Sequence, residues 1–402
     1  MAGTITVDTI QSDSSYSSTI NIASPINIGS SMTIGGQSSS FSRNIIVNGS
    51  MQIAQRNGTS STAITATTGL LRYHDVDRFG TSVAQGSVTT EQSTDVPSGQ
   101  GFRYSKKVTC TSASSNTTHN YCEVPYLMEG YDANSIGWDY TSPTSYVTVS
   151  FWARSSVAGT YPFQLRNPGE KVITSYYTLE ANTWKKITAT FPGESAAVIL
   201  NNNGAELTLI FSIDAGTRYT DNTAPANTWF TVTSENDYYK DYSQRWMSNV
   251  GATFNLTGVQ IEAGQVATPF QFTPFATDLQ RCMRYYQKSR PYATGERASY
   301  SAGFPFDIQA YQNCVIASDD GAAAFSIEFP VEMRASPTAY TVIPAGTIST
   351  SMLMNNYNAS GYGTMTGYAT QTSTKRIVSY ATGTVNVGQE FAVVWFADAE
   401  LT

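Results

Sequence analysis

Charged side chains are scarce in this sequence. Acidic and basic residues make up 13% of its 402 residues, about half of the usual share. Basic residues never run longer than a pair, and the net charge is −7. Proteins that bind nucleic acid or anionic lipid gather Lys and Arg into patches, so the composition argues against both partners. No run of about 18 apolar residues is present to cross a membrane.

Histidine and cysteine are also rare. The two histidines, His74 and His119, have no GxSxG motif to accompany them, which leaves nucleophilic catalysis without support. The four cysteines form no CxxC pair and no zinc-binding spacing. Cys110 and Cys122 flank a polar loop and can pair if it closes a hairpin; the alternative is buried free thiols. The first residues lack the basic and apolar regions of a signal peptide.

Strand-forming residues take the place of the missing charge. The sequence is rich in Ser, Thr, Asn and Gly, and it contains 25 tyrosines and 18 phenylalanines. This composition is typical of β-strands joined by polar turns. A chain of 402 residues is too long for one core, so we expect an all-β protein of two or three domains.

Residues 1–43 differ from the rest of the chain. They contain short alternating pieces, too small to bury a core, between Ser/Gly linkers. One interpretation is a flexible tail. The other is an extended anchoring segment whose isoleucines are buried on the common axis of three copies. The candidate anchor and trimer residues are Ile20, Ile22, Ile26 and Ile28.

Residues 44–275 are predicted to form a β-sandwich. Apolar residues alternate strictly in Tyr146–Ala153, Trp184–Phe191 and Leu207–Ile213, as in antiparallel sheets with one buried face. The last strand, Phe254–Glu262, changes phase at Gly258. A β-bulge at this glycine would restore a continuous buried face.

One helix and a further β region complete the prediction. Residues 276–291 are expected to form a linking helix, because apolar residues recur at helical spacing from Leu279 to Tyr286. Thr277 is the expected cap of this helix. Residues 292–402 are expected to form a C-terminal β tip domain. The strand within Glu390–Ala399 is apolar on both sides, so another subunit could cover its second face.

Several segments, taken in chain order, resemble tail fibre and fibre-like proteins of short-tailed marine phages. The family's pieces are an N-terminal segment, three strands of a jelly roll like that of carbohydrate-binding modules, the helix after it and a C-terminal feature. The corresponding segments are Gly3–Ser12, Asn44–Arg56, Val149–Arg154, Gly258–Phe270, Leu279–Tyr286 and Phe329–Pro337.

The resemblance implies a homotrimer of a phage particle, attached to other virion proteins by its N-terminus and with its C-terminal end outermost. It implies assembly in the host cytoplasm, whose reducing conditions favour free thiols. It does not imply sugar binding, because the jelly roll is often kept as a spacer. Tail fibres, head fibres and baseplate parts contain similar modules.

Two carboxylates are the strongest sign of catalysis. Asp75 and Asp77 stand two residues apart and would share one face of a strand, as glycoside cleavage could use. The stronger interpretation is structural, with Asp77 paired to Arg78 or capping a turn. Glu262 or Asp77 could hold a calcium ion, but no spacing demands a metal, and we expect no cofactor and no enzymatic activity.

The stretch Met352–Thr370 is the candidate receptor contact. It is rich in Gly, Asn, Tyr and Met and is expected to form long exposed loops, whose Tyr and Asn side chains suit an adaptable surface for host glycan. The alternative is that these tyrosines are packed strand residues. The candidates are Asn355, Asn356, Tyr357, Tyr362 and Tyr368.

Three functions remain open at this stage. The first is a homotrimeric tail fibre or receptor-binding protein located in the virion. The second is a head fibre, decoration or adaptor protein with an architectural role. The third is a glycan-cleaving tailspike, which is disfavoured because no repeat of the kind that forms a β-helix is present.

Overall fold

A computed structural model describes most of the chain from residue 43 onward. The chain divides into two compact units, Met1–Phe41 and Ser42–Thr402, which are described separately. The described residues are 33–34, 37–38, 43–57, 60–65, 71–114, 118–169, 171–196, 198–220, 225–234, 238–240, 245–290, 292, 315–316, 323–342, 348–349, 351–356, 364–381, 391–392 and 395–401.

In the first unit, β1 (Thr33–Ile34) pairs with β2 (Gln37–Ser38). The four isoleucines expected to anchor a trimer lie outside the described residues.

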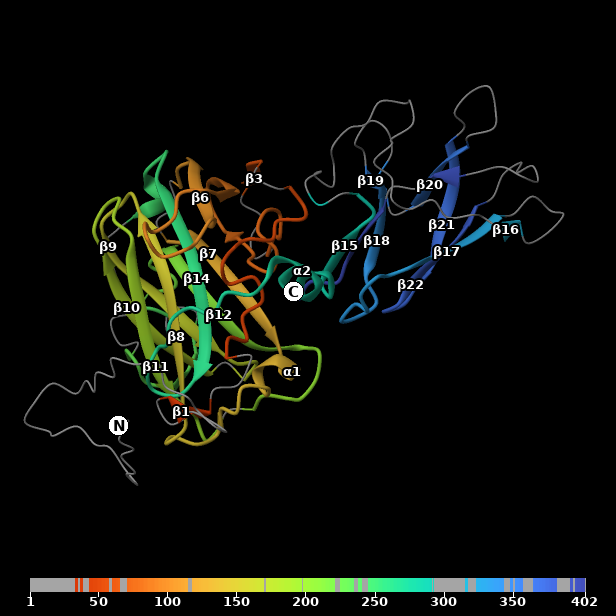
Figure 1. The fold of residues 1–402 in the computed structure, drawn as a ribbon. Helices are drawn as coiled ribbons and strands as arrows, with labels where there is room; N and C mark the ends of the chain where they lie inside the picture. Colours follow the sequence, from red (N-terminus) through yellow and green to blue (C-terminus); the bar gives the residue numbers. More distant parts are fainter. Residues whose placement is uncertain are drawn as a thin grey trace, which may run out of the picture. The chain divides into compact units, whose positions relative to one another are not determined.

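The second unit contains a sandwich of two six-stranded antiparallel sheets (Figure 1). The first sheet, in spatial order, is β13 (Phe230–Thr231), β10 (Lys171–Leu179), β9 (Gly159–Arg166), β12 (Ala205–Ala215), β7 (Tyr121–Glu129) and β4 (Ser82–Val83). The second is β11 (Lys185–Pro192), β8 (Tyr146–Ser155), β14 (Thr253–Ala263), β6 (Ser105–Ser112), β5 (Ser87–Ser93) and β3 (Thr62–Thr65). The all-β prediction is therefore confirmed.

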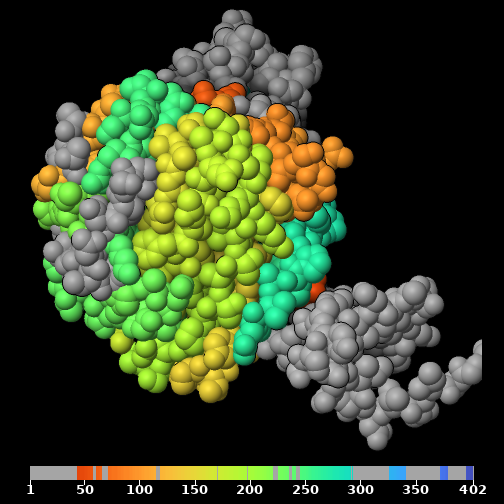
Figure 2. Space-filling view, turned by 90° about the vertical axis from the view of Figure 1, so that its left-hand side faces the viewer, coloured from red at the N-terminus to blue at the C-terminus, as the bar shows by residue number. Residues whose placement is uncertain are grey.

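Alternation in the sequence places the core between these sheets. The Phe151 ring of β8 lies 5.0 Å from that of Phe163 in β9 and 4.8 Å from that of Phe211 in β12, edge to face. All three side chains are fully buried. Burial of each stabilises the fold by about 1.5–3 kcal/mol of transfer free energy. Figure 2 shows a face of the molecule dominated by the yellow-to-lime stretch that contains β8 to β11, with the teal stretch after β14 along its border.

The predicted bulge in β14 is confirmed. The register of β14 against β8 shifts between Thr257 and Gln260, and Gly258 has a φ of +64°. A Cβ atom at Gly258 would lie 2.6 Å from Cζ of Phe102. Phe102 is held in turn by the rings of Phe270 and Phe272, at 5.0 and 5.2 Å. The position therefore requires glycine both for its backbone and for its space.

Replacement of Gly258 should destabilise the fold for this reason. We expect Gly258→Ala to lower the free energy of unfolding by about 2–4 kcal/mol, from left-handed strain plus overpacking. Gly251→Ala is the matched control, because Gly251 has a φ of +87° but open space around it, and should cost about 1 kcal/mol. Urea unfolding of both variants measures the difference; equal losses would show that contact with Phe102 contributes nothing.

The predicted helix is shorter than expected and begins differently. It is α2 (Phe275–Met283), with Pro274 at the N-cap and no side-chain cap, so the expected cap at Thr277 is wrong. Tyr286 lies instead in β15 (Tyr286–Lys288), whose pairing with the last strand overrides the helical spacing. The other described helices are α1 (Gly130–Ala133) and the 3₁₀ turn η2 (Trp246–Ser248).

The remaining strands form two antiparallel sheets. The first is β15, β24 (Trp395–Asp398), β18 (Thr338–Val342) and β19 (Ile348–Ser349). The second is β16 (Val315–Ile316), β17 (Ala323–Glu328), β22 (Arg376–Ala381), β21 (Thr364–Thr372), β20 (Ser351–Asn356) and β23 (Phe391–Ala392).

The two-sided apolar strand is covered by its own chain. Trp395 and Phe396 of β24 are each 4% exposed. The Trp395 ring packs on Phe329 at 5.6 Å, and the Phe396 ring stacks on Tyr340 at 4.8 Å. In the described part of this strand, Trp395–Asp398, residues of the same chain therefore cover both sides, and the expected cover by another subunit is wrong there. Any trimer must be stabilised elsewhere.

Candidate functional site

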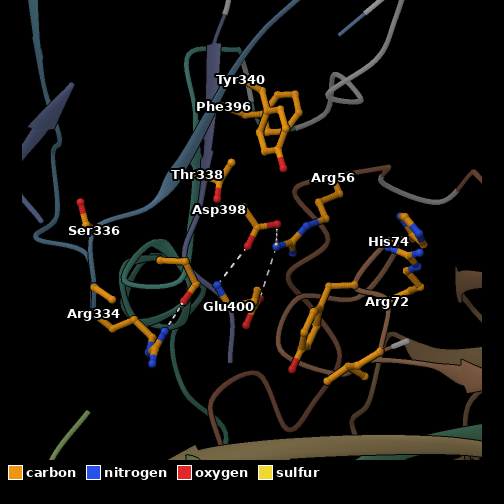
Figure 3. Close-up of a pocket in the computed structure, with 14 residues that line it drawn as sticks. Arg56, Arg72, His74, Arg334, Ser336, Thr338, Tyr340, Phe396, Asp398 and Glu400 are labelled. Carbon is orange, nitrogen blue, oxygen red and sulfur yellow. Dashed lines mark hydrogen bonds and ion pairs between the residues drawn. The ribbon is translucent and has the colours of Figure 1, made fainter. Parts of the chain in front are cut away.

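A pocket of about 480 Å³ lies between the 71–74 segment and strands β18 and β24 (Figure 3). We call it the junction pocket. Its lining joins residues more than 250 positions apart in the sequence, and it combines three arginines, two carboxylates and an aromatic pair. The lining residues are Arg56, Leu71, Arg72, Tyr73, His74, Arg334, Ala335, Ser336, Thr338, Tyr340, Phe396, Asp398, Ala399 and Glu400.

Buried ion pairs form one side of the pocket. Arg56 Nη2 lies 3.1 Å from Asp398 Oδ2 and 3.4 Å from Glu400 Oε1. The other oxygen of Glu400 accepts a hydrogen bond from Arg78 Nη1. The side chains of Arg56, Arg78 and Glu400 are exposed by 3% or less. This group holds the last residues of the chain against the 55–78 region.

Burial and charge act in opposite directions on these arginines. Burial acts most strongly and lowers the pKa of Arg78, but Glu400 together with Tyr285, Tyr126 and Tyr73 holds the pKa well above its usual value. Each guanidinium also lies over an aromatic ring: Arg78 is 3.5 Å from the centroid of Tyr285, and Arg56 is 4.0 Å from that of Tyr286. Cation–π contact adds stabilisation in such a desolvated place. The charges of Arg56, Arg78, Asp398 and Glu400 therefore neutralise one another; we call this group of ion pairs the joint.

Asp75 and Asp77, the pair considered for catalysis, are structural. Lys106 Nζ donates to Asp75 Oδ1 at 2.5 Å, and Gln55 Nε2 donates to Asp77 Oδ2 at 2.6 Å. Both carboxylates are 1% exposed. Burial raises the pKa of Asp77 to about 6 against the opposing effect of Arg56. Neither carboxylate is placed to meet a substrate, and the expected pairing of Asp77 with Arg78 is wrong: Asp77 faces Arg56 instead, at 3.9 Å.

The other candidates from the sequence are accounted for differently. His74 lines the junction pocket, whereas the Nε2 atom of His119 lies 3.0 Å from Arg218 Nη1. Glu262 accepts hydrogen bonds from the main chain and hydroxyl of Thr268, at 2.8 and 2.7 Å. Within the described part of the chain, no group of three or more His, Cys, Asp or Glu side chains could hold a metal ion.

The sequence left open whether the cysteines are paired or free. Cys110, Cys122 and Cys282 are free and buried, so the alternative of a disulfide between Cys110 and Cys122 is wrong. Burial raises the pKa of the Cys122 thiol well above its usual value, which keeps it unreactive.

None of the described helices has the length and apolar character needed to cross a membrane.

The receptor candidates are only partly visible. Asn355 and Asn356 lie in β20 and Tyr368 lies in β21, and these two strands pair from Ser351↔Tyr368 to Asn355↔Thr364. Strand pairing thus replaces much of the expected long loops, because Thr, Tyr and Met favour strands despite the nearby glycines. Tyr357 and Tyr362 lie outside the described residues.

An aromatic platform forms the opposite wall of the junction pocket. The ring of Tyr340 lies nearly parallel to that of Phe396, with an angle of 22° between them. In Figure 3 this pair lies on one side of Arg56, while Arg72 and His74 lie on the other. Such a mixture of a flat apolar wall and convergent polar groups is typical of small-ligand sites. The sequence pointed to Arg56 and Arg334 only through segments that resemble the phage family.

Known proteins offer limited comparison. No family model and no curated protein sequence matches the chain. Among solved structures, the enzymatically active domain of tailspike protein 4 of bacteriophage CBA120 is similar, at 13% identity and a TM-score of 0.30. The match covers 56% of this chain and 21% of that chain.

Two carbohydrate-binding domains are also similar. A xylan-binding domain from Paenibacillus barcinonensis matches at 13% identity and a TM-score of 0.23, over 53% of this chain and 100% of that domain. A family 11 carbohydrate-binding module from Clostridium thermocellum, in complex with a mixed-linked tetrasaccharide, matches at 14% identity and a TM-score of 0.26. Its match covers 53% of this chain and 100% of the module. Likeness of this degree does not assign a function to the chain.

Proposed function

We propose that this chain is a non-enzymatic structural protein of a bacteriophage particle. In this proposal it is a homotrimeric tail fibre or receptor-binding protein, attached to other virion proteins by residues 1–43 and in contact with host glycan through its C-terminal region. It is assembled in the host cytoplasm and binds neither nucleic acid nor a membrane interior. The ordered series of segments that resemble phage fibre proteins supports the phage origin.

The buried joint between Arg78 and Glu400 is the observation that carries the structural role. It fixes Glu400, near the end of the chain, to Arg78, 322 residues away in sequence. Arg284 reinforces the joint with two hydrogen bonds to Glu129, at 2.9 and 2.7 Å. Leu401 packs with Leu127 and Tyr285 in the same place. A receptor-binding protein needs such a stiff connection, because a contact made by one part must hold the whole particle.

Pre-treatment of host cells tests this proposal. Purified full-length protein added before the phage should block adsorption in a dose-dependent way, because it occupies the same receptor. Heat-unfolded protein at the same concentration is the control. Adsorption at the untreated rate would favour the architectural alternative, a head fibre, decoration or adaptor. Release of sugars from host polysaccharide by the protein would favour a tailspike.

Deletion of residues 292–402 is a poor test of host contact. It removes Asp398 and Glu400, and it thereby leaves the buried Arg78 without its paired carboxylate and Arg56 with Asp77 alone, 3.9 Å away. Loss of adsorption would then reflect an unfolded sandwich. Substitutions that leave the joint intact are needed instead.

A further inference from the structure

We infer that the junction pocket binds an acidic saccharide, a sugar ring that carries a carboxylate, and that Arg72 and Arg334 recognise its charge. This inference rests on the proposed function, since it names the chemistry of the receptor. It goes beyond the candidate residues of β20 and β21, which lie outside this pocket.

Some of the positive charges that line the junction pocket have no paired carboxylate. Arg56 and Arg78 are matched by Asp77, Asp398 and Glu400. Among the residues that the structure describes, no carboxylate pairs with Arg72 or Arg334. Arg72 is therefore available to an external anion, and Arg334, whose nitrogens donate to main-chain oxygens, adds positive charge to the lining.

Arg334 is held in place by neutral groups. Its Nε and Nη2 atoms donate to the main-chain oxygen of Asn203, at 3.2 and 2.8 Å, and Nη1 donates to that of Ala399, at 2.9 Å. Burial lowers the pKa of this side chain against the opposing effects of Glu129, Tyr285 and Glu400. The fixed orientation presents a positive charge without the entropic cost of ordering a free side chain.

A planar carboxylate suits these groups. Arginine binds carboxylates through two parallel hydrogen bonds, which gives both energy and geometric selection. Arg72 is half-buried and lines the pocket beside His74. Its side chain is thus accessible at the wall opposite Tyr340 (Figure 3).

The rest of the lining suits a sugar ring. The ring of Tyr340, which stacks on the buried Phe396 and is itself half-buried, offers a flat apolar surface to the C–H face of a pyranose. Thr338 and the carboxylate of Asp398, whose side chain is 33% exposed, can meet ring hydroxyls. The volume of about 480 Å³ falls within the range of about 300–1,000 Å³ found for small-ligand sites. A simple phosphate ion would leave this aromatic wall unused.

Calorimetric titration of the full-length protein tests the inference. The probes are a glucuronic acid disaccharide, the matched glucose disaccharide and inorganic phosphate. We expect the acidic disaccharide to bind most tightly and Arg72→Gln to raise its dissociation constant about ten- to a hundredfold, the usual range for a charged hydrogen bond. Arg376→Gln, which changes an exposed arginine paired with Glu328, should leave the constant unchanged. Tyr340→Ala should weaken both disaccharides.

Three kinds of result would overturn the inference. Equal binding of the acidic and neutral disaccharides, or no effect of Arg72→Gln with an unchanged melting temperature, would remove the role of charge. Binding of phosphate alone would make the pocket an anion site rather than a saccharide site. If no saccharide binds but the protein still blocks adsorption, the inference fails while the proposed function stands. Saccharide binding without a block of adsorption would support the inference and contradict the proposed function.

Discussion

Glu400→Gln should lower the free energy of unfolding by about 3–5 kcal/mol, because it leaves the buried Arg78 without its counter-charge. The side chain of Arg78 is 0% exposed and that of Glu400 is 3% exposed, so water cannot replace the lost partner. Chemical unfolding followed by tryptophan fluorescence measures this loss.

An exposed ion pair provides the matched control for this substitution. Glu332 Oε2 lies 3.9 Å from Lys375 Nζ, and the two side chains are 55% and 70% exposed. Glu332→Gln should therefore change stability by less than about 1 kcal/mol. If the two variants lose equal stability, the joint at Glu400 does not hold the end of the chain to the sandwich.

Substitution of the N-terminal isoleucines should abolish attachment to the particle and leave the sandwich folded. In the proposed trimer each buried isoleucine contributes about 1.5–3 kcal/mol, and an aspartate in its place would carry a charge to the common axis. The substituted residues are Ile20, Ile22, Ile26 and Ile28, all to Asp. Particles assembled with this variant should lack the protein on immunoblots, while its melting temperature should match that of the wild type.

Four neighbouring polar residues allow a control with the same added charge. They alternate with the isoleucines and would face outward in the proposed bundle. The control substitutions are Ser17, Thr19, Asn21 and Asn27, all to Asp. Particles should retain this second variant. If both variants are lost equally, added negative charge rather than a lost apolar row explains the defect; if both are retained, these isoleucines do not anchor the protein.

Local patterns in the sequence predicted the sandwich well. The strict alternation of Tyr146–Ala153 corresponds to β8, and the phase change at Gly258 corresponds to the bulge in β14. Both features depend on neighbours within one strand and on the two-residue period of side chains. Such information is present in any short window of the sequence.

Features that depend on distant partners were not predictable in this way. Arg78 directly follows Asp77, yet its partner Glu400 lies 322 residues away. Tyr286 fits a helical spacing, but pairing of its backbone with Asp398 places it in a strand. The junction pocket is made of such long-range contacts, so its residues could not be grouped from the sequence. The covered faces of Trp395 and Phe396 were missed for the same reason.

That correction changes the basis of the trimer proposal. The apolar strand β24 is satisfied within its own chain by Phe329, Tyr340 and Tyr286. The need for partner copies now depends on the apolar rows of residues 1–43 alone. We propose that partner copies bury these rows, because each piece is too short to form its own core; a flexible tail is the alternative.

The mass of the purified full-length protein in solution is the most direct test of this account. Sedimentation or light scattering should give three times the chain mass of 43.6 kDa, and removal of residues 1–43 should reduce the assembly to single, still folded chains. A full-length protein that stays at 43.6 kDa across the concentrations found during assembly would contradict the trimeric fibre.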